Sequence, residues 1–81
     1  MDHAAKHRLS VPQDVDARAI RSALGMTQAA FAATFGVPLT TLRDWEQGRS
    51  RPDMAARSYL QVIERRPEAV RQALALSLIH I

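Results

Sequence analysis

Apolar residues recur at a spacing of three or four along most of this chain, which indicates helices rather than strands. The clearest example is the segment from residue 27 to 48, TQAAFAATFGVPLTTLRDWEQG. Its first half places Phe31 and Phe35 on one side of a helix, and its second half does the same with Leu42 and Trp45. We expect these four side chains to be buried and to hold the two halves together.

Local signals set the ends of the two helices, which we predict over residues 28–35 and 38–47. Thr27 is a natural N-cap, because its hydroxyl can accept a hydrogen bond from an N–H group of the first turn. Gly36 suits the left-handed conformation in which helices often end. Pro38 suits the first turn of a helix, where a missing N–H costs nothing. Two helices joined by a short turn that contains glycine are the signature of a helix-turn-helix.

Three further helices flank this pair. Asp14 or Asp16 can cap a first helix that ends near residue 24, another helix is predicted over residues 54–65, and Pro67 begins a fifth, short helix. We therefore predict an all-α domain of five helices over residues 14–75. The expected inward positions of the flanking helices are Ile20, Leu24, Leu60, Ile63, Val70 and Leu74.

The two ends of the chain differ from this helical pattern. Residues 1–13 carry several charges and little apolar material, and we expect them to form a flexible basic arm. Residues 76–81, LSLIHI, are apolar and have no polar face. One back-translation of them resembles the end sequence of a common transposon-based sequencing adapter, so we interpret them as a non-native tail. The alternative is a native C-terminus that docks on the domain or on a dimer mate.

Length and composition limit the classes of protein that fit. A chain of 81 residues makes one small domain with a modest core, for which a dimer or another partner is plausible. The chain has no cysteine, which excludes disulfides and thiolate metal sites and fits a cytoplasmic protein. His3 and His7 lack a third ligand nearby, so we expect no metal. We find neither a secretory signal nor an apolar run that could span a membrane.

The charge pattern favours binding over catalysis. The net charge of +3 favours a polyanionic partner. Acidic residues are scattered over predicted caps and surfaces, and no nucleophile lies beside a base, so we expect neither an enzyme nor a cofactor. The segment 48–52, GRSRP, is a basic loop directly after the second motif helix. It is either a solvated turn or a clamp for phosphate groups.

The central segment resembles a known family. The string TQ-x-x-FA-x-x-FGVP-x-x-TL-x-x-WE-x-G is similar to the XRE, or Cro and phage-repressor, helix-turn-helix proteins, and the resemblance extends over residues 15–52. It implies a five-helix phage-repressor-like fold and a sequence-specific DNA-binding transcriptional regulator. The matching positions are Gln28, Ala32, Gly36, Leu42, Trp45, Glu46 and Gly48.

The resemblance also implies how such a protein contacts DNA. The second motif helix would lie in the major groove, with Arg43 as the best base reader because its guanidinium can bond two acceptors of a guanine. The residues expected to face the bases are Leu39, Thr40, Arg43 and Asp44, with Asp44 also able to orient Arg43. The residues expected to bind phosphates are Gln28, Thr41, Gln47, Arg49 and Arg51, with the role of Gln28 implied by the resemblance.

An ion pair between Arg21 and Glu46 is also predicted. Arg21 follows the inward-facing Ile20. Glu46 lies at the C-terminal end of its helix, where the helix dipole disfavours a carboxylate unless a cation compensates it. An Arg and a Glu at these motif positions are paired in phage-type repressors, which the resemblance carries to this chain. The alternative is that both side chains are solvated, as most surface charges are.

Within the family, the chain is similar to HigA-like and NadS-like antitoxins. The residues that carry this similarity are Ile20-Arg21, the WEQG of residues 45–48, the RxRP of residues 49–52 and the RRPEAV of residues 65–70. It implies an autorepressing antitoxin of a RelE/HigB-like ribonuclease toxin. We also expect a homodimer on an inverted-repeat operator, because two copies bind better than one. The alternatives are a stand-alone XRE-family repressor and a helical protein-interaction module without a DNA role.

Overall fold

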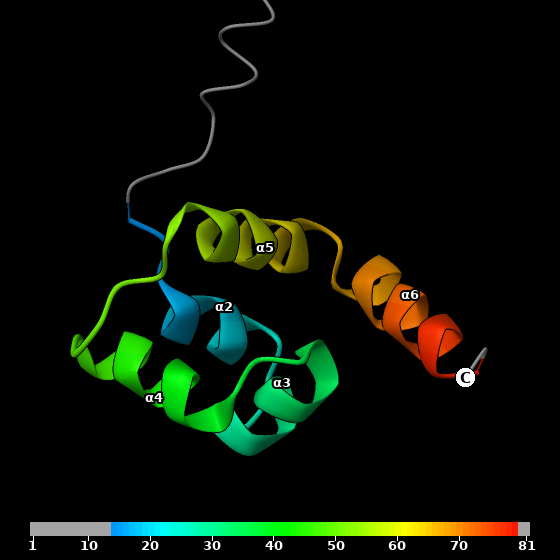
Figure 1. Ribbon diagram of the computed structural model, residues 1–81, viewed down its shortest axis with the longest axis horizontal. Helices are drawn as coiled ribbons and strands as arrows, with labels where there is room; N and C mark the ends of the chain where they lie inside the picture. The colour runs from blue at the N-terminus through cyan, green and yellow to red at the C-terminus, as the bar shows by residue number, and fades with distance from the viewer. Residues whose placement is uncertain (1–13, 80–81) are drawn as a thin grey trace, which may run out of the picture.

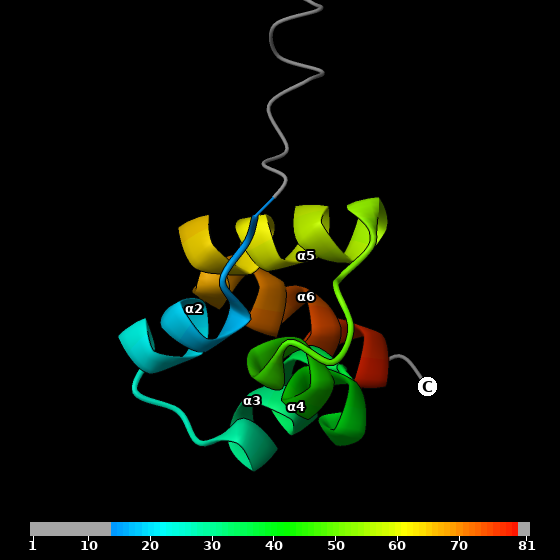
Figure 2. The ribbon, with the colours of Figure 1, turned by 90° about the vertical axis from the view of Figure 1, so that its left-hand side faces the viewer.

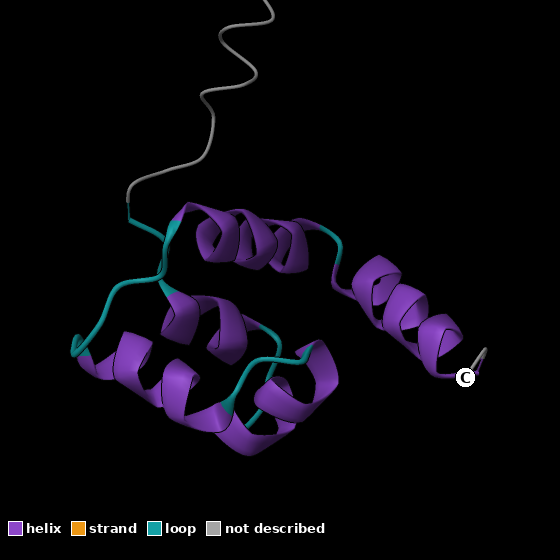
Figure 3. Ribbon diagram, in the orientation of Figure 1, coloured by secondary structure: helices purple, strands orange, loops and turns teal. Residues whose placement is uncertain are grey.

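The computed structural model describes residues 14–79 of the chain, and this part consists of helices joined by short loops, without a strand (Figure 3). The all-α fold predicted from the sequence is confirmed. The arm over residues 1–13 lies outside the described residues. The five helices are α2 (Ala17–Ala23), α3 (Gln28–Phe35), α4 (Leu39–Gln47), α5 (Met54–Arg65) and α6 (Pro67–Ile79).

The helices pack in a ring of neighbours rather than in parallel layers. Helix α2 lies between α4 and α5 and contacts both (Figure 1). Helix α3 contacts α4 on one side and α6 on the other, and α6 also packs against α5 (Figure 2). The helices α2, α5 and α6 therefore form a support that fixes the α3–turn–α4 unit.

The core is a single apolar cluster to which all five helices contribute. Its largest fully buried side chains come from α3, α4 and α5, and the rings of Phe31 and Phe35 lie 4.9 Å apart at an angle of 53°. Burying a large apolar side chain contributes roughly 1.5–3 kcal/mol. The buried members of the cluster are Ala17, Ile20, Phe31, Ala32, Phe35, Val37, Leu42, Leu60, Ile63 and Val70.

Three side-chain caps fix where the helices begin. Asp16, Thr27 and Asp53 each accept a hydrogen bond from the backbone N–H three residues later, at 3.0, 3.0 and 2.8 Å. These bonds satisfy N–H groups that have no partner within their own helix. The structure thus selects Asp16 rather than Asp14 as the cap of α2.

Two helix ends differ from the sequence prediction. Pro38 is the N-cap of α4 rather than its first helical residue, because its ψ of 134° is extended. Helix α6 is not short: it runs to Ile79 and includes the first four residues of the segment that we interpret as a non-native tail. Leu76 is 55% exposed, so this continuation adds no packing at that position.

Candidate nucleic-acid interface

The turn between α3 and α4 is fixed by a glycine, by backbone hydrogen bonds and by one buried apolar side chain. Gly36 adopts the left-handed conformation at φ 71°, which a residue without a Cβ reaches most easily. Its N–H and that of Val37 both donate to the carbonyl of Ala32. Val37 is buried in the core between the two helices. The turn therefore sets α4 at a fixed angle to α3.

Helix α4 has a buried side and an exposed polar side. Leu42 is completely buried, whereas Thr40 and Arg43 are exposed, as expected for residues that face away from the core. The prediction that Leu39 also faces away from the core is wrong. Leu39 is half-buried and packs against the core, because it lies one turn before Leu42 on the same side of the helix.

Two neighbouring residues of α4 also differ from the prediction. Trp45 is only half-buried, because its indole forms one wall of a surface pocket in addition to packing on the core. The carboxylate of Asp44 lies 3.9 Å from Arg49 of the following loop. Asp44 therefore pairs with Arg49, and within residues 14–79 it makes no hydrogen bond or ion pair with Arg43.

The ion pair between Arg21 and Glu46 is present, as predicted. Arg21 donates from Nε to Glu46 Oε2 at 2.7 Å and from Nη2 to Glu46 Oε1 at 2.8 Å. The Glu46 side chain is fully buried and that of Arg21 is 17% exposed. A third donor of Arg21, Nη1, bonds the carbonyl of Met26 at 2.9 Å. This bidentate pair joins α2 to α4 and to the loop that precedes α3.

Two more donors reach the Glu46 carboxylate, and the sequence analysis missed both contacts. Gln28 Nε2 donates to Glu46 Oε1 at 3.0 Å, and Arg18 Nε lies 3.4 Å from the same oxygen. Hydrogen bonding from Arg21, supported by Gln28 and Arg18, outweighs burial and lowers the pKa of Glu46 to about 2. The contact of Arg18 could have been predicted from the sequence, because Arg18 lies three residues before Arg21 on the same helix face.

Gln28 also contacts Arg43 on the exposed side of α4. Arg43 Nε donates to Gln28 Oε1 at 3.4 Å. The amide of Gln28 is thus bonded at both ends, to a buried carboxylate and to an exposed guanidinium. The residues predicted to bind phosphates differ in exposure: Gln47, Arg49 and Arg51 are exposed, whereas Gln28 and Thr41 are half-buried.

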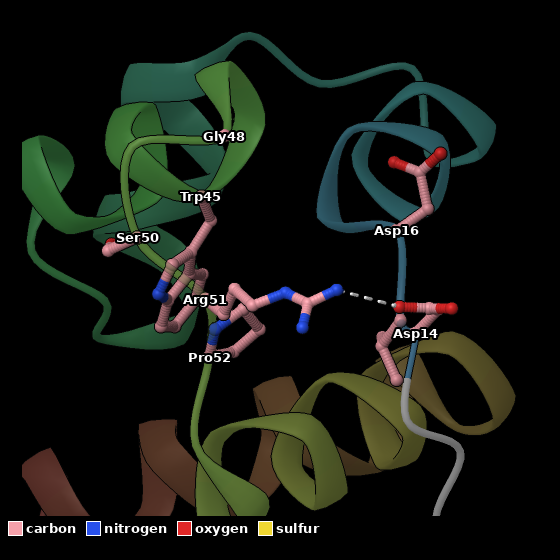
Figure 4. Close-up of a pocket in the computed structure, with 8 residues that line it drawn as sticks. Asp14, Asp16, Trp45, Gly48, Ser50, Arg51 and Pro52 are labelled. Carbon is pink, nitrogen blue, oxygen red and sulfur yellow. Dashed lines mark hydrogen bonds and ion pairs between the residues drawn. The ribbon is translucent and has the colours of Figure 1, made fainter.

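The loop after α4 borders a shallow surface pocket of ≈ 240 Å³ (Figure 4). Arg51 extends across this pocket and lies 3.5 Å from the carboxylate of Asp14, just before α2. Both side chains are almost fully exposed, so the pairing is weak. Arg51 is therefore available to an anion that competes with Asp14.

We also searched the described residues for a metal site and for a membrane-spanning helix. Residues 14–79 contain no group of three or more His, Asp or Glu side chains that could hold a metal ion. No helix within this range is long and apolar enough to cross a membrane.

Comparison with known proteins identifies relatives of this chain. A family model described as helix-turn-helix matches residues 18–56. Antitoxin HigA-2 from Vibrio cholerae is 37% identical over 51 residues, which is 63% of this chain and 49% of the relative. The chain thus spans about half the length of that relative.

A solved structure gives the more complete match. A crystal structure of a helix-turn-helix XRE-family-like protein from Agrobacterium tumefaciens superposes with a TM-score of 0.70 at 54% sequence identity. The match covers 70% of this chain and 92% of that one. At this identity and coverage, the match shows the family as well as the fold. The chain belongs to the XRE family of helix-turn-helix proteins.

Proposed function

We propose that the protein is a non-enzymatic, sequence-specific DNA-binding transcriptional regulator. The observation that carries this proposal is the exposed side of α4, where Thr40 and Arg43 point away from a rigid scaffold. A helix presented in this way fits the major groove, whose base edges offer a distinct pattern of donors and acceptors. Arg43 would bond a guanine, Thr40 would contact a thymine methyl, and Asp44 would lie at the margin of the contact.

The backbone of the DNA would be held by residues on α4 and in the loop that follows it. Arg49 and Arg51 lie in the loop after the helix, each within 4.0 Å of a single carboxylate that a phosphate can replace. Gln47 at the end of α4 and Thr41 on its side add neutral donors. Contacts of this kind fix the register of the helix without reading sequence.

A homodimer on an inverted repeat is part of the proposal. One domain with a few phosphate contacts binds weakly, and two half-sites one helical turn apart would engage two copies of α4 at once. Val62 on α5 is an exposed large apolar residue that suits a surface between copies. Sedimentation equilibrium of the full chain measures this directly, and a monomer at every concentration, with and without DNA, would contradict it.

The finer proposal is an autorepressing antitoxin that binds a RelE/HigB-like ribonuclease toxin. Its support is the similarity to Antitoxin HigA-2 over 51 residues. The alternative is a stand-alone repressor of the same family, which needs the same DNA-binding face and no toxin. The neighbouring reading frame separates the two. A small basic ribonuclease whose toxicity is relieved by co-expression of this chain supports the antitoxin, and the absence of such a gene supports the stand-alone repressor.

Fluorescence anisotropy tests the DNA-binding proposal itself. The full chain is titrated with a labelled duplex from its own upstream region and with a shuffled duplex of the same composition. We expect tighter binding to the upstream duplex and a linear fall of log affinity with log salt, with a slope of about −0.9 per phosphate contact. No binding to the upstream duplex at low salt would reject the proposal and favour a protein-interaction module.

A further inference from the structure

Gln28 lies between the buried centre of the domain and the exposed face of α4. Its Nε2 is 3.0 Å from Glu46 Oε1, and its Oε1 is 3.4 Å from Arg43 Nε. Gln28 is the first residue of α3, whereas the other two side chains belong to α4. One amide therefore connects a fully buried carboxylate with the guanidinium that faces outward.

The buried carboxylate determines which way the amide points. An ionised Glu46 only accepts hydrogen bonds, so the NH₂ end of the Gln28 amide must face it. The carbonyl end then points in the opposite direction, toward Arg43. Glu46 itself cannot turn away, because Arg21 holds both of its oxygens at 2.7 and 2.8 Å. The orientation of Gln28 is thus set by a rigid pair in the interior.

This arrangement leaves a particular edge of Arg43 available. Its Nε is bonded to Gln28, and within residues 14–79 its two terminal nitrogens make no hydrogen bond. The acceptors N7 and O6 of a guanine lie side by side in the major groove and match a pair of parallel donors. With Nε occupied, Nη1 and Nη2 form that pair.

We infer that Gln28 is a positioning residue that presents the Nη1–Nη2 edge of Arg43 to a guanine. The inference rests on the proposed function and gives Gln28 a role in sequence preference, in place of the phosphate contact expected from the sequence. A phosphate contact would contribute equally to the affinity for every DNA sequence. A positioning contact acts only at the base pair that Arg43 reads.

The test compares Gln28→Met with the matched control Gln72→Met, an exposed glutamine on α6. Affinities of each variant are measured for the upstream duplex and for every single-base change within its footprint. Arg43→Ala identifies the base pair that Arg43 reads. We expect Gln28→Met to reduce the preference at that base pair by roughly threefold or more, as residues coupled in one network do. Preferences at other positions and in the control should not change.

The double variant and a measurement without DNA complete the design. In the Arg43→Ala background, Gln28→Met should no longer change the preference at that base pair. In the free protein, the NMR signal of the Arg43 Nε–H group should shift in Gln28→Met and stay in place in Gln72→Met.

The outcomes separate failure of the positioning role from failure of DNA binding. A uniform loss of affinity across all sequences, or an unchanged preference at the Arg43 base pair, overturns the positioning role while DNA binding stands. An unmoved Arg43 Nε–H signal overturns the contact itself, with or without DNA. A wild-type protein that binds no DNA overturns the proposed function, and the positioning role fails with it.

Discussion

A single carboxylate, that of Glu46, joins three segments that are distant in sequence. Its two oxygens are bonded or paired with Arg18 and Arg21 of α2 and with Gln28 of α3, while Glu46 itself belongs to α4. A buried charge is tolerated only when it is paired and hydrogen-bonded, as this one is. The network therefore holds the proposed DNA-reading helix more specifically than apolar packing alone, because it fixes direction as well as proximity.

Removing one partner of this pair should be costly. Arg21→Met removes the bidentate partner of the fully buried Glu46 carboxylate and leaves it, within residues 14–79, only the contacts with Arg18 and Gln28. We expect a loss of about 3–5 kcal/mol in the free energy of unfolding. Glu46→Gln in the same background removes the poorly paired charge, so it should restore part of the loss. A double-mutant cycle by urea denaturation measures the coupling. The exposed Glu64→Gln serves as the control, and a coupling energy near zero would show that the pair adds nothing.

The same carboxylate should make stability depend on pH in the acid range. The pKa of Glu46 is lowered from 4.5 to about 2, so its contribution is complete above about pH 4.5 and is lost as the pH falls toward 2. A shift of this size corresponds to about 3 kcal/mol. Unfolding free energies of the wild type and of Glu46→Gln, measured between pH 5 and 2, should converge at low pH. Parallel curves would contradict the assignment.

At the scale of the element, α4 and the loop behind it should respond differently to the loss of an arginine. Arg43→Ala should cost about 1–3 kcal/mol of DNA binding and remove the preference at one base pair. Arg51→Ala should weaken binding to all sequences alike and reduce the salt slope by about one. Anisotropy titrations over a salt series with matched duplexes separate the two effects. If both variants show the same uniform loss, Arg43 does not read a base.

The last part of α6 offers a second prediction at this scale. Deleting residues 76–81 should leave the melting temperature and DNA affinity unchanged, because we interpret these residues as foreign and Leu76 is exposed. The inward-facing Leu74, which packs against the core, remains in place. Thermal denaturation of the shortened chain checks this, and a fall of several degrees would show that the segment packs natively.

The sequence predicts the helices well because their ends are encoded locally. Caps such as Thr27 and Asp53, each followed by apolar residues at helical spacing, place α3 and α5 without knowledge of the rest of the fold. The Arg21–Glu46 pair was also predicted, but from a family resemblance joined to a helix-dipole argument, and not from spacing.

Other features of the site depend on tertiary packing and could not be predicted. Whether Leu39 and Trp45 are covered depends on how closely α4 approaches its neighbours, which helical periodicity does not determine. The partners of Gln28 lie 15 and 18 residues away on another helix. An amide with two different ends gives no sign in the sequence of which group each end will meet.

At the scale of the molecule, the fold separates support from recognition. Helices α2, α5 and α6 lie against the α3–turn–α4 unit (Figures 1 and 2). The exposed side of α4 carries Thr40 and Arg43. The exposed apolar residue Val62 lies on α5, a different helix from α4. A dimer built through α5 would leave both copies of α4 free for DNA.

A methylation-interference experiment decides whether α4 lies in the major groove. Dimethyl sulfate methylates N7 of guanine, which lines the major groove, and N3 of adenine, which lines the minor groove. We expect methylation of one guanine in each half-site of the upstream duplex to block the wild-type protein, and the same methylation to have little further effect on Arg43→Ala. Interference confined to adenine N3, or no interference at any guanine, would contradict the placement of α4 and the role of Arg43.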